Sequence, residues 1–253
     1  MSTFAPVSFP ANKPLVTLTR SGPVFLLTLH NDDNRFTTTS VGAIFMALDV
    51  VERAYVDEGM PEMALVTTGK GKFYSNGLDL EHALSTPRFM EDYYLKMLSR
   101  LCTFPIPTVA AINGHAFAGG CVFAMAHDYR VMRSDRGFIC MNEIDFGAPI
   151  PPGMTALLRT KMQPHTFRDV ALLGRRFGGG EALEHHIVDE IVKGTEEEVL
   201  RQATMMAIKV SVKAKSGASA YQMIKAEMYG EVVNYLAKPF DPSGKSSGKS
   251  AKL

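Results

Sequence analysis

The sequence predicts an α/β fold followed by a helix-rich C-terminal region. Short apolar runs typical of strands alternate with segments of helical periodicity before Pro152. Buried strands that alternate with helices indicate crossover connections and a largely parallel sheet. After Pro152 the helical patterns dominate, so we expect an appended layer of helices. With 253 residues, the chain is long enough for one large domain.

The first elements are a hairpin, a long helix and a buried strand. Residues 15–18 and 24–29 are expected to be strands joined by a Ser-Gly-Pro turn. Over residues 38–58, apolar side chains recur three and four positions apart, which predicts an amphipathic helix. Residues 63–67 form a short apolar run, typical of a strand buried on both faces.

The later elements repeat this alternation. An amphipathic helix is expected over residues 89–101 and a fully apolar strand over 107–112. The remaining expected elements are short strands at 128–133 and 137–140 and helices at 195–212 and 218–236. We therefore divide the chain into a core (1–195), a C-terminal helical region (196–240) and a flexible tail (241–253).

Composition excludes several classes of function. The formal net charge of +1 offers no electrostatic attraction to nucleic acid or to a membrane surface. No apolar run approaches the roughly 20 residues of a membrane span. The three cysteines lack paired spacing, which favours small buried side chains over a disulfide framework. His185 and His186 have no acidic partner at ligand spacing, so no metal site is expected.

Two glycine-bearing stretches carry the chemistry of this chain. GKFYSNGLDL at residues 71–80 and AAINGHAFAGGCVFA at 110–124 each follow an apolar strand and lead toward a helix. Glycines at such corners let backbone N–H groups point into open space. The candidate donors are the N–H groups of Leu78 and Gly119. If the corners face each other, these two groups would bind an oxyanion.

These two stretches resemble the oxyanion-hole segments of the crotonase (enoyl-CoA hydratase/isomerase) superfamily, and the resemblance extends over about residues 15–236. It implies a spiral of ββα units with C-terminal helices that build a homotrimer or a dimer of trimers. It also implies an acyl-CoA substrate whose thioester oxygen lies between the N–H groups of Leu78 and Gly119. The implied substrate-binding residues are Ser75, Asn76, Gly77, Leu78, Asp79 and Gly119. For Asp79, a helix-capping role is the preferred interpretation.

The carboxylates distinguish between members of this superfamily. Its hydratases carry two glutamates, and the position of one, three residues after the oxyanion glycine, is Val122 here. The position of the other is Glu143, in the segment MNEIDFGAP, whereas Asp145 is expected to be a surface carboxylate. Hydration requires a positioned water, while moving a double bond requires one base. A single carboxylate between apolar walls is also expected to have a raised pKa.

The single glutamate makes the chain most similar to the Δ3,Δ2-enoyl-CoA isomerase branch, with Val122 as a dry wall of the pocket. The expected activity converts 3-enoyl-CoA to trans-2-enoyl-CoA with Glu143 as proton shuttle and no metal or redox cofactor, since CoA enters with the substrate. The alternatives are another crotonase chemistry, such as a hydratase or dienoyl-CoA isomerase, and a non-catalytic acyl-CoA-binding subunit. Basic side chains that could meet the CoA phosphates, or remain solvated, are Arg35, Lys213, Lys215 and Lys225.

The tail carries a candidate address. Residues 241–253 are mostly Ser, Gly and Lys, a composition that cannot bury a core. They end in Ala251, Lys252 and Leu253, which resembles the S-K-L signal read by the peroxisomal import receptor. We therefore expect a peroxisomal location.

Overall fold

The centre of the fold is a seven-stranded sheet, described here from a computed structural model that covers residues 4–215 and 218–239. Its order is β1-β2-β3-β4-β6-β8-β10, antiparallel from β1 to β3 and parallel from β3 onward. The strands are β1 (Val7–Phe9), β2 (Val16–Ser21), β3 (Val24–Leu29), β4 (Ala64–Gly69), β6 (Thr108–Ile112), β8 (Tyr129–Arg133) and β10 (Glu190–Val192).

A second, three-stranded sheet positions the candidate site. Its strands, β5 (Phe73–Ser75), β7 (His115–Phe117) and β9 (Ile139–Cys140), pair in parallel in the order β5-β7-β9. Each follows one strand of the large sheet in the chain: β4 precedes β5, β6 precedes β7, and β8 precedes β9. Because the strands are parallel, the segments that leave their carboxyl ends meet at one edge. The sequence did not predict β5 or β7, since three residues are too few to show a period.

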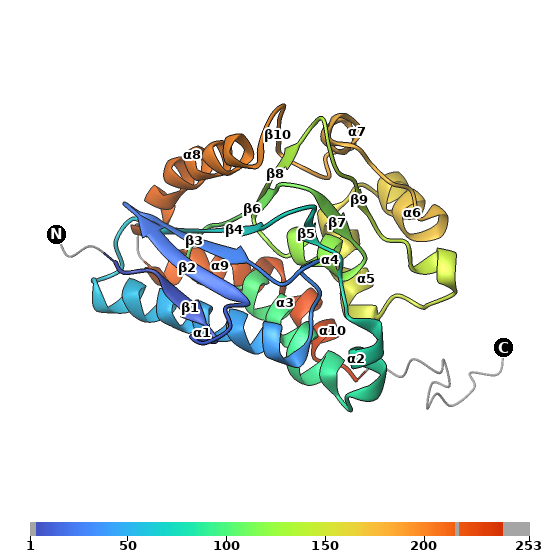
Figure 1. The fold of residues 1–253 in the computed structure, drawn as a ribbon, viewed down its shortest axis with the longest axis horizontal. Helices are drawn as coiled ribbons and strands as arrows, with labels where there is room; N and C mark the ends of the chain where they lie inside the picture. Colours follow the sequence, from blue (N-terminus) through green and yellow to red (C-terminus); the bar gives the residue numbers. More distant parts are fainter. Residues whose placement is uncertain (1–3, 216–217, 240–253) are drawn as a thin grey trace.

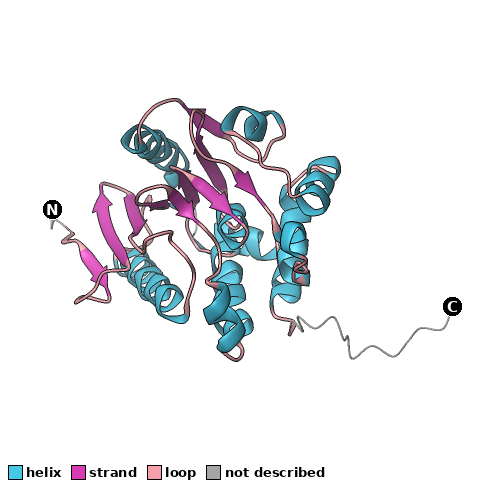
Figure 2. Ribbon diagram, turned by 45° about the vertical axis from the view of Figure 1, so that its right-hand side comes forward, coloured by secondary structure: helices cyan, strands magenta, loops and turns pink. Residues whose placement is uncertain are grey.

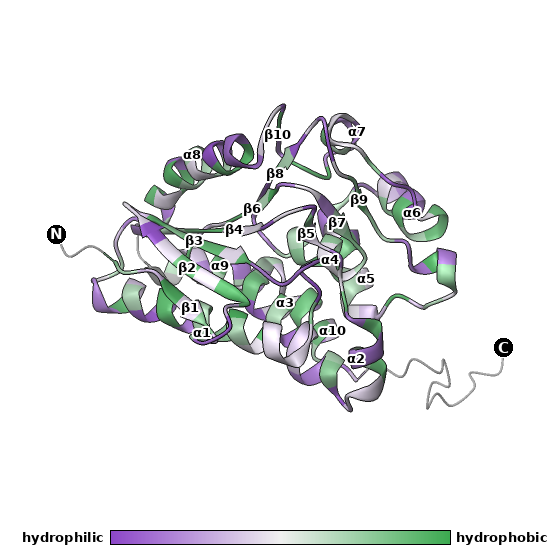
Figure 3. Cartoon of the chain, viewed as in Figure 1, coloured by the Kyte–Doolittle hydropathy of each residue, from purple (hydrophilic) through white to green (hydrophobic). Residues whose placement is uncertain are grey.

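Helices cover both faces of the large sheet. In Figure 1, α1 (Thr38–Asp57) lies below the sheet and α8 (Glu196–Lys215) lies above it. Strand side chains alternate between the two layers: Leu65 packs in the cluster that includes α1, and Val66 packs in the cluster that includes α8. The turned view in Figure 2 shows strands between helices. The first turn of α8 begins with acidic residues and is purple in Figure 3.

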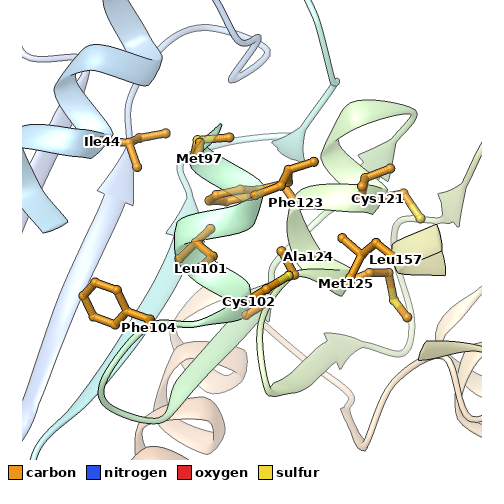
Figure 4. Close-up of a cluster of buried hydrophobic side chains, with 14 of the residues drawn as sticks. Ile44, Met97, Leu101, Cys102, Phe104, Cys121, Phe123, Ala124, Met125 and Leu157 are labelled. Atoms are coloured by element: carbon orange, nitrogen blue, oxygen red, sulfur yellow. The ribbon is translucent and has the colours of Figure 1, made fainter. Parts of the chain in front are cut away.

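The main core surrounds α4 (Gly119–Met125), all of whose residues are buried. Figure 4 shows Phe123 of α4 near Met97 of α3 (Leu95–Cys102), with Ile44 of α1 on the far side of α3. A π-helical turn, Met90–Tyr94, leads directly into α3. The remaining helices are α2 (Leu80–Ser85), α5 (Pro152–Lys161), α6 (Pro164–Leu173), α7 (Gly179–Glu184), α9 (Ala218–Met228) and α10 (Gly230–Leu236).

The predicted α/β fold with a helical C-terminal region is confirmed. The helix predicted over 38–58 is α1, but the one predicted over 89–101 begins as the π-turn, and the one over 218–236 is interrupted at Tyr229. Strand β10 was not predicted, because its three residues are too few to show a period. The division into core, helical region and tail stays a prediction. Residues 241–253, including the candidate address, lie outside the described residues.

Two further expectations from the composition concern the cysteines and membrane-spanning helices. All three cysteines are buried and free. Within residues 4–215 and 218–239, no helix combines the length and the apolar character that crossing a membrane requires.

The interpretation of Lys225 as solvated or phosphate-binding is wrong. Its Nζ lies 2.9 Å from a carboxylate oxygen of Asp128, the residue is 4% exposed, and the Tyr221 hydroxyl donates to the same carboxylate at 3.1 Å. This pair fastens α9 to the start of β8. Lys215 pairs with Glu62 at the surface.

Replacing Lys225 tests this attachment. Lys225→Met leaves the largely buried charge of Asp128 without its cationic partner, so we expect the free energy of unfolding to fall by about 3 kcal/mol. Urea denaturation measures it, and the exposed Lys213→Met is the matched control, expected to change it by less than about 0.5 kcal/mol. Equal midpoints for the two variants would contradict the structural role of the pair.

Candidate active site

The two glycine corners are in direct contact at the carboxyl ends of β5 and β7. Gly77 has a φ of +77°, and a Cβ built on it would lie 2.9 Å from the Gly119 nitrogen and 3.2 Å from the Cβ of Ala118. Any side chain at Gly77 would therefore be strained and would separate the corners. The structure thus brings together the two segments that the sequence singled out.

Each corner contains a backbone N–H group that has no acceptor among the described residues. Phe36 pairs with the first corner: its N–H donates to the Gly77 carbonyl at 2.8 Å, and its carbonyl accepts from the Asp79 N–H at 3.1 Å. The N–H of Leu78, between these two bonds, donates to no group in the described part of the chain. Nor does the N–H of Gly119, the first residue of α4, since first-turn N–H groups have no acceptor inside the helix.

Ala118 sets the direction of the second donor. Its backbone has φ +51° and ψ −120°, a conformation that is costly for any residue but glycine. Its N–H donates to the Cys140 carbonyl at 2.9 Å, and its carbonyl accepts from the Cys121 and Val122 N–H groups. These bonds hold the peptide between Ala118 and Gly119 in the orientation that leaves its N–H unpaired.

Glu143 follows β9 in a short 3-10 turn, Glu143–Phe146. Its side chain is buried, and its Oε2 has no hydrogen-bond partner among the described residues. Burial raises the pKa of Glu143 from 4.5 to about 7, with a smaller opposing effect from its own backbone N–H. The Oδ1 of the neighbouring Asn142 is also buried and unpartnered. This edge therefore carries a carboxyl that takes up and releases a proton near neutral pH.

A cavity of about 600 Å³ opens beside these groups. Of the predicted site residues, Asn76, Leu78 and Glu143 line it, and Arg35 does so as well. The other lining residues come from segments 80–91, 117–118 and 142–154. The apolar ones in the first segment are Leu80, Ala83, Leu84, Pro87, Phe89 and Met90. A largely apolar cavity whose lining includes a few polar groups suits a ligand with an apolar chain.

The other predicted site residues support the first corner from outside the cavity lining. The Ser75 hydroxyl accepts from the Gly77 N–H at 3.2 Å and donates to the Asn34 carbonyl at 2.7 Å. Asp79 caps α2 by accepting from the His82 N–H at 2.9 Å, as the capping interpretation predicted. Gly77 and Gly119 do not line the cavity themselves, although residues next to them in the chain do. A direct substrate contact therefore stays a prediction for four residues, Ser75, Gly77, Asp79 and Gly119.

Two details differ from the sequence-based picture. Val122 is fully buried but does not line the cavity. It therefore replaces the second carboxylate of the hydratases, but it does not form an apolar wall of the cavity as predicted. Tyr94, which lies in the amphipathic helix expected over residues 89–101, donates from its hydroxyl to the Gly119 carbonyl at 2.5 Å. Asp145 is exposed, as expected. Among the described residues, no group of His, Cys, Asp and Glu could hold a metal ion.

Comparison with known proteins yields one family. The sequence pattern of the enoyl-CoA hydratase/isomerase family matches residues 21–242. Enoyl-CoA delta isomerase 3 of Arabidopsis thaliana is 34% identical, over 86% of this chain and 93% of its own. The peroxisomal enoyl-CoA delta isomerase 2 of the same plant is also 34% identical, over 88% and 95%.

Among solved structures, an enoyl-CoA hydratase from Mycobacterium marinum superposes with a TM-score of 0.76, at 25% identity, over 88% of this chain and 94% of its own. The crotonase-like fold is thereby confirmed.

The buried carboxyl makes a prediction about stability. Because folding raises the pKa of Glu143, its charged form costs stability, and this cost grows as pH rises from 4.5 through about 7. Glu143→Gln has the same shape and no charge, so its free energy of unfolding should equal that of the parent at pH 4.5 and exceed it by about 3 kcal/mol at pH 8.5. Urea denaturation at both pH values measures the difference.

The matched control is Asp145→Asn, which removes an exposed carboxylate from the same turn. We expect it to shift the unfolding free energy by less than about 0.5 kcal/mol at either pH. If the Glu143→Gln variant is instead less stable than the parent at pH 8.5, then the fold stabilises the charged form of Glu143.

Proposed function

Since the chain belongs to the enoyl-CoA hydratase/isomerase family, we propose that it converts 3-enoyl-CoA thioesters to trans-2-enoyl-CoA. The observation that carries this proposal is one buried carboxyl, Glu143, whose Oε2 has no hydrogen-bond partner among the described residues, at the edge where the unused N–H groups of Leu78 and Gly119 meet. The two delta isomerases, 34% identical over most of both chains, support the same reaction.

The reaction moves one proton and one double bond. The thioester oxygen accepts hydrogen bonds from the N–H groups of Leu78 and Gly119, and the Glu143 carboxylate removes a proton from C2. The electron pair of the broken C2–H bond moves into the thioester, which forms a dienolate whose negative oxygen lies between the two donors. The protonated Glu143 then returns the proton to C4, and the double bond is left between C2 and C3. This scheme needs no metal or redox cofactor.

The environment of Glu143 suits both half-reactions. A carboxyl with a pKa of about 7 is deprotonated often enough to act as base near neutral pH. It is also a stronger base than an ordinary solvated carboxylate. Its Oε2 has no partner to release before it reaches C2 or C4. Fixed backbone donors need little reorganisation when the charge develops, and losing one typically lowers the rate by about 10²–10³-fold.

Hydration is the second candidate, because the similar Mycobacterium marinum structure is described as a hydratase. Adding water in this family's manner requires a second carboxylate at the position of Val122, and a valine cannot hold the water. The other glutamate of the cavity lining, Glu91, lies on the π-turn and is more exposed than Glu143. These features favour isomerisation.

We propose further that the enzyme works as a homotrimer, or a dimer of trimers, in peroxisomes. The relative named peroxisomal supports the location, with Ala251, Lys252 and Leu253 as the segment the import receptor reads. Exposed apolar side chains on α8 and α9 support association. They are Met205, Ile208, Val212, Met223, Ile224 and Met228.

Glu143→Gln tests the assignment of the base. With 3-hexenoyl-CoA as substrate, we expect kcat to fall by about 10³-fold, because the amide cannot accept the C2 proton, while KM changes little. Asp145→Asn is the control and should keep the parent rate. A Glu143→Gln enzyme with parental activity would exclude Glu143 as the base.

The same assay separates the rival functions. Hydration of 2-hexenoyl-CoA by the parent enzyme without conversion of 3-hexenoyl-CoA would identify a hydratase. Turnover no faster than buffer, together with tight binding of acyl-CoA, would identify a non-catalytic binding subunit.

The location has its own test. A fluorescent protein fused before Met1 should give a punctate pattern that coincides with a peroxisomal marker in plant cells. Removing residues 251–253 should make the signal diffuse, because the receptor reads those residues. A punctate pattern that survives the deletion would exclude them as the address.

A further inference from the structure

We propose that Tyr94 is a positioning residue that holds the two N–H donors, those of Leu78 and Gly119, at a fixed separation. The inference rests on the proposed function, in which both donors bind one thioester oxygen. Tyr94 is fully buried and does not line the cavity, so it acts through the backbone of the corners and not through contact with substrate.

The first link is a hydrogen bond to the second corner. The Tyr94 hydroxyl lies 2.5 Å from the Gly119 carbonyl oxygen and must be the donor, since a carbonyl only accepts. Gly119 has no side chain to restrict its backbone, and it follows Ala118, whose conformation is strained. A bond to its carbonyl limits rotation about the Gly119 backbone and so fixes the direction of the Gly119 N–H.

The second link reaches the first corner. A Cβ built on Gly119 would lie 3.0 Å from the Tyr94 hydroxyl oxygen and 3.4 Å from the Cα of Gly77, so all three groups converge on one point. The Tyr94 ring also packs against Phe36, with ring centroids 5.4 Å apart. Phe36 brackets Leu78 through its two backbone hydrogen bonds. One rigid side chain therefore contacts the second corner directly and is linked to the first corner through Phe36.

The local backbone explains how Tyr94 reaches this point. Tyr94 ends the π-helical turn, in which the Leu95 N–H donates to the Met90 carbonyl, five residues back. Such a turn contains one residue more than an α-helical turn, and π-turns are frequent at functional sites. Before Tyr94, Phe89 and Met90 line the cavity, whereas Met97 after it packs beside Phe123 of α4 (Figure 4). With this wider turn, one helical segment lines the cavity with Phe89 and Met90, binds the second corner through Tyr94 and packs in the core with Met97.

The Tyr94 hydroxyl donates its hydrogen bond to the Gly119 carbonyl and not to Glu143. Glu143 Oε2 has no hydrogen-bond partner, so the phenol does not donate to it. Burial, and then the nearby Glu143 charge, raise the pKa of Tyr94 well above its usual value. Tyr94 therefore stays neutral and keeps its proton throughout the working range of the enzyme.

Tyr94→Phe removes only the hydroxyl and is the direct test. With 3-hexenoyl-CoA we expect kcat to fall about tenfold, because one hydrogen bond that fixes a donor is lost and the donor itself remains. We expect KM to stay within about twofold, and the acid limb of kcat/KM against pH to keep its midpoint. Tyr93→Phe is the matched control: Tyr93 lies on the same turn, and its hydroxyl makes no hydrogen bond within the described residues. It should keep the parent kcat.

Each other outcome overturns the inference. Unchanged kcat in Tyr94→Phe shows that the donors need no such support. A raised KM at constant kcat indicates ordinary substrate binding, and a midpoint shifted by more than about half a pH unit shows that the hydroxyl acts on Glu143. If Tyr94→Phe does not fold, Phe36→Leu loosens the same link from the first corner and should lower kcat at constant KM. A parent enzyme that does not isomerise 3-hexenoyl-CoA disproves the proposed function instead, whatever the variants do.

Discussion

The parallel pairing of β5, β7 and β9 is the constraint on which the candidate site depends. These strands are two or three residues long, yet their pairing places the segments that follow them side by side. The Ala118 N–H donates to the carbonyl of Cys140, three residues before Glu143. The donor and the base therefore follow neighbouring strand ends, and main-chain hydrogen bonds set the separation of the backbone segments that carry them.

Helix α4 is held at both ends, which keeps this geometry stable. Tyr94 binds the carbonyl of its first residue, and His127 binds the carbonyl of Phe123 through Nδ1 at 2.8 Å. Since that carbonyl only accepts, Nδ1 carries the proton and Nε2 accepts from the Thr67 hydroxyl at 2.9 Å, which in turn accepts from Tyr74. Burial lowers the pKa of His127 to about 3, so this chain of hydrogen bonds stays intact at neutral pH.

The sequence reveals the parts of the site that depend on local pattern and not those that depend on distant pairing. Gly77 and Gly119 are visible because a glycine after an apolar strand has few other uses, and Glu143 is visible beside them once the family is recognised. Tyr94 looks like any core aromatic, since its bond to Gly119 joins residues that no periodicity connects. Lys225 looks like a solvated helix charge, because its partner, Asp128, is far away in the sequence. Helix α1 was predicted well because its apolar face repeats over 20 residues.

Asp128, which is largely buried, and Glu143, which is buried, differ in how well the burial of their carboxyl groups is compensated. Asp128 accepts from the Thr108 N–H and hydroxyl, from the Tyr221 hydroxyl and from Lys225, so its burial is compensated. Glu143 is also buried, yet its Oε2 has no partner. Because the fold supplies several hydrogen-bond donors to the largely buried Asp128, it could equally have supplied donors to Glu143 Oε2. Leaving Glu143 Oε2 without a partner costs stability, and Glu143 lines a cavity beside the corners that carry the unpaired N–H groups of Leu78 and Gly119. A purely structural carboxyl has no reason to remain in that state, whereas a base that must reach a carbon acid requires it.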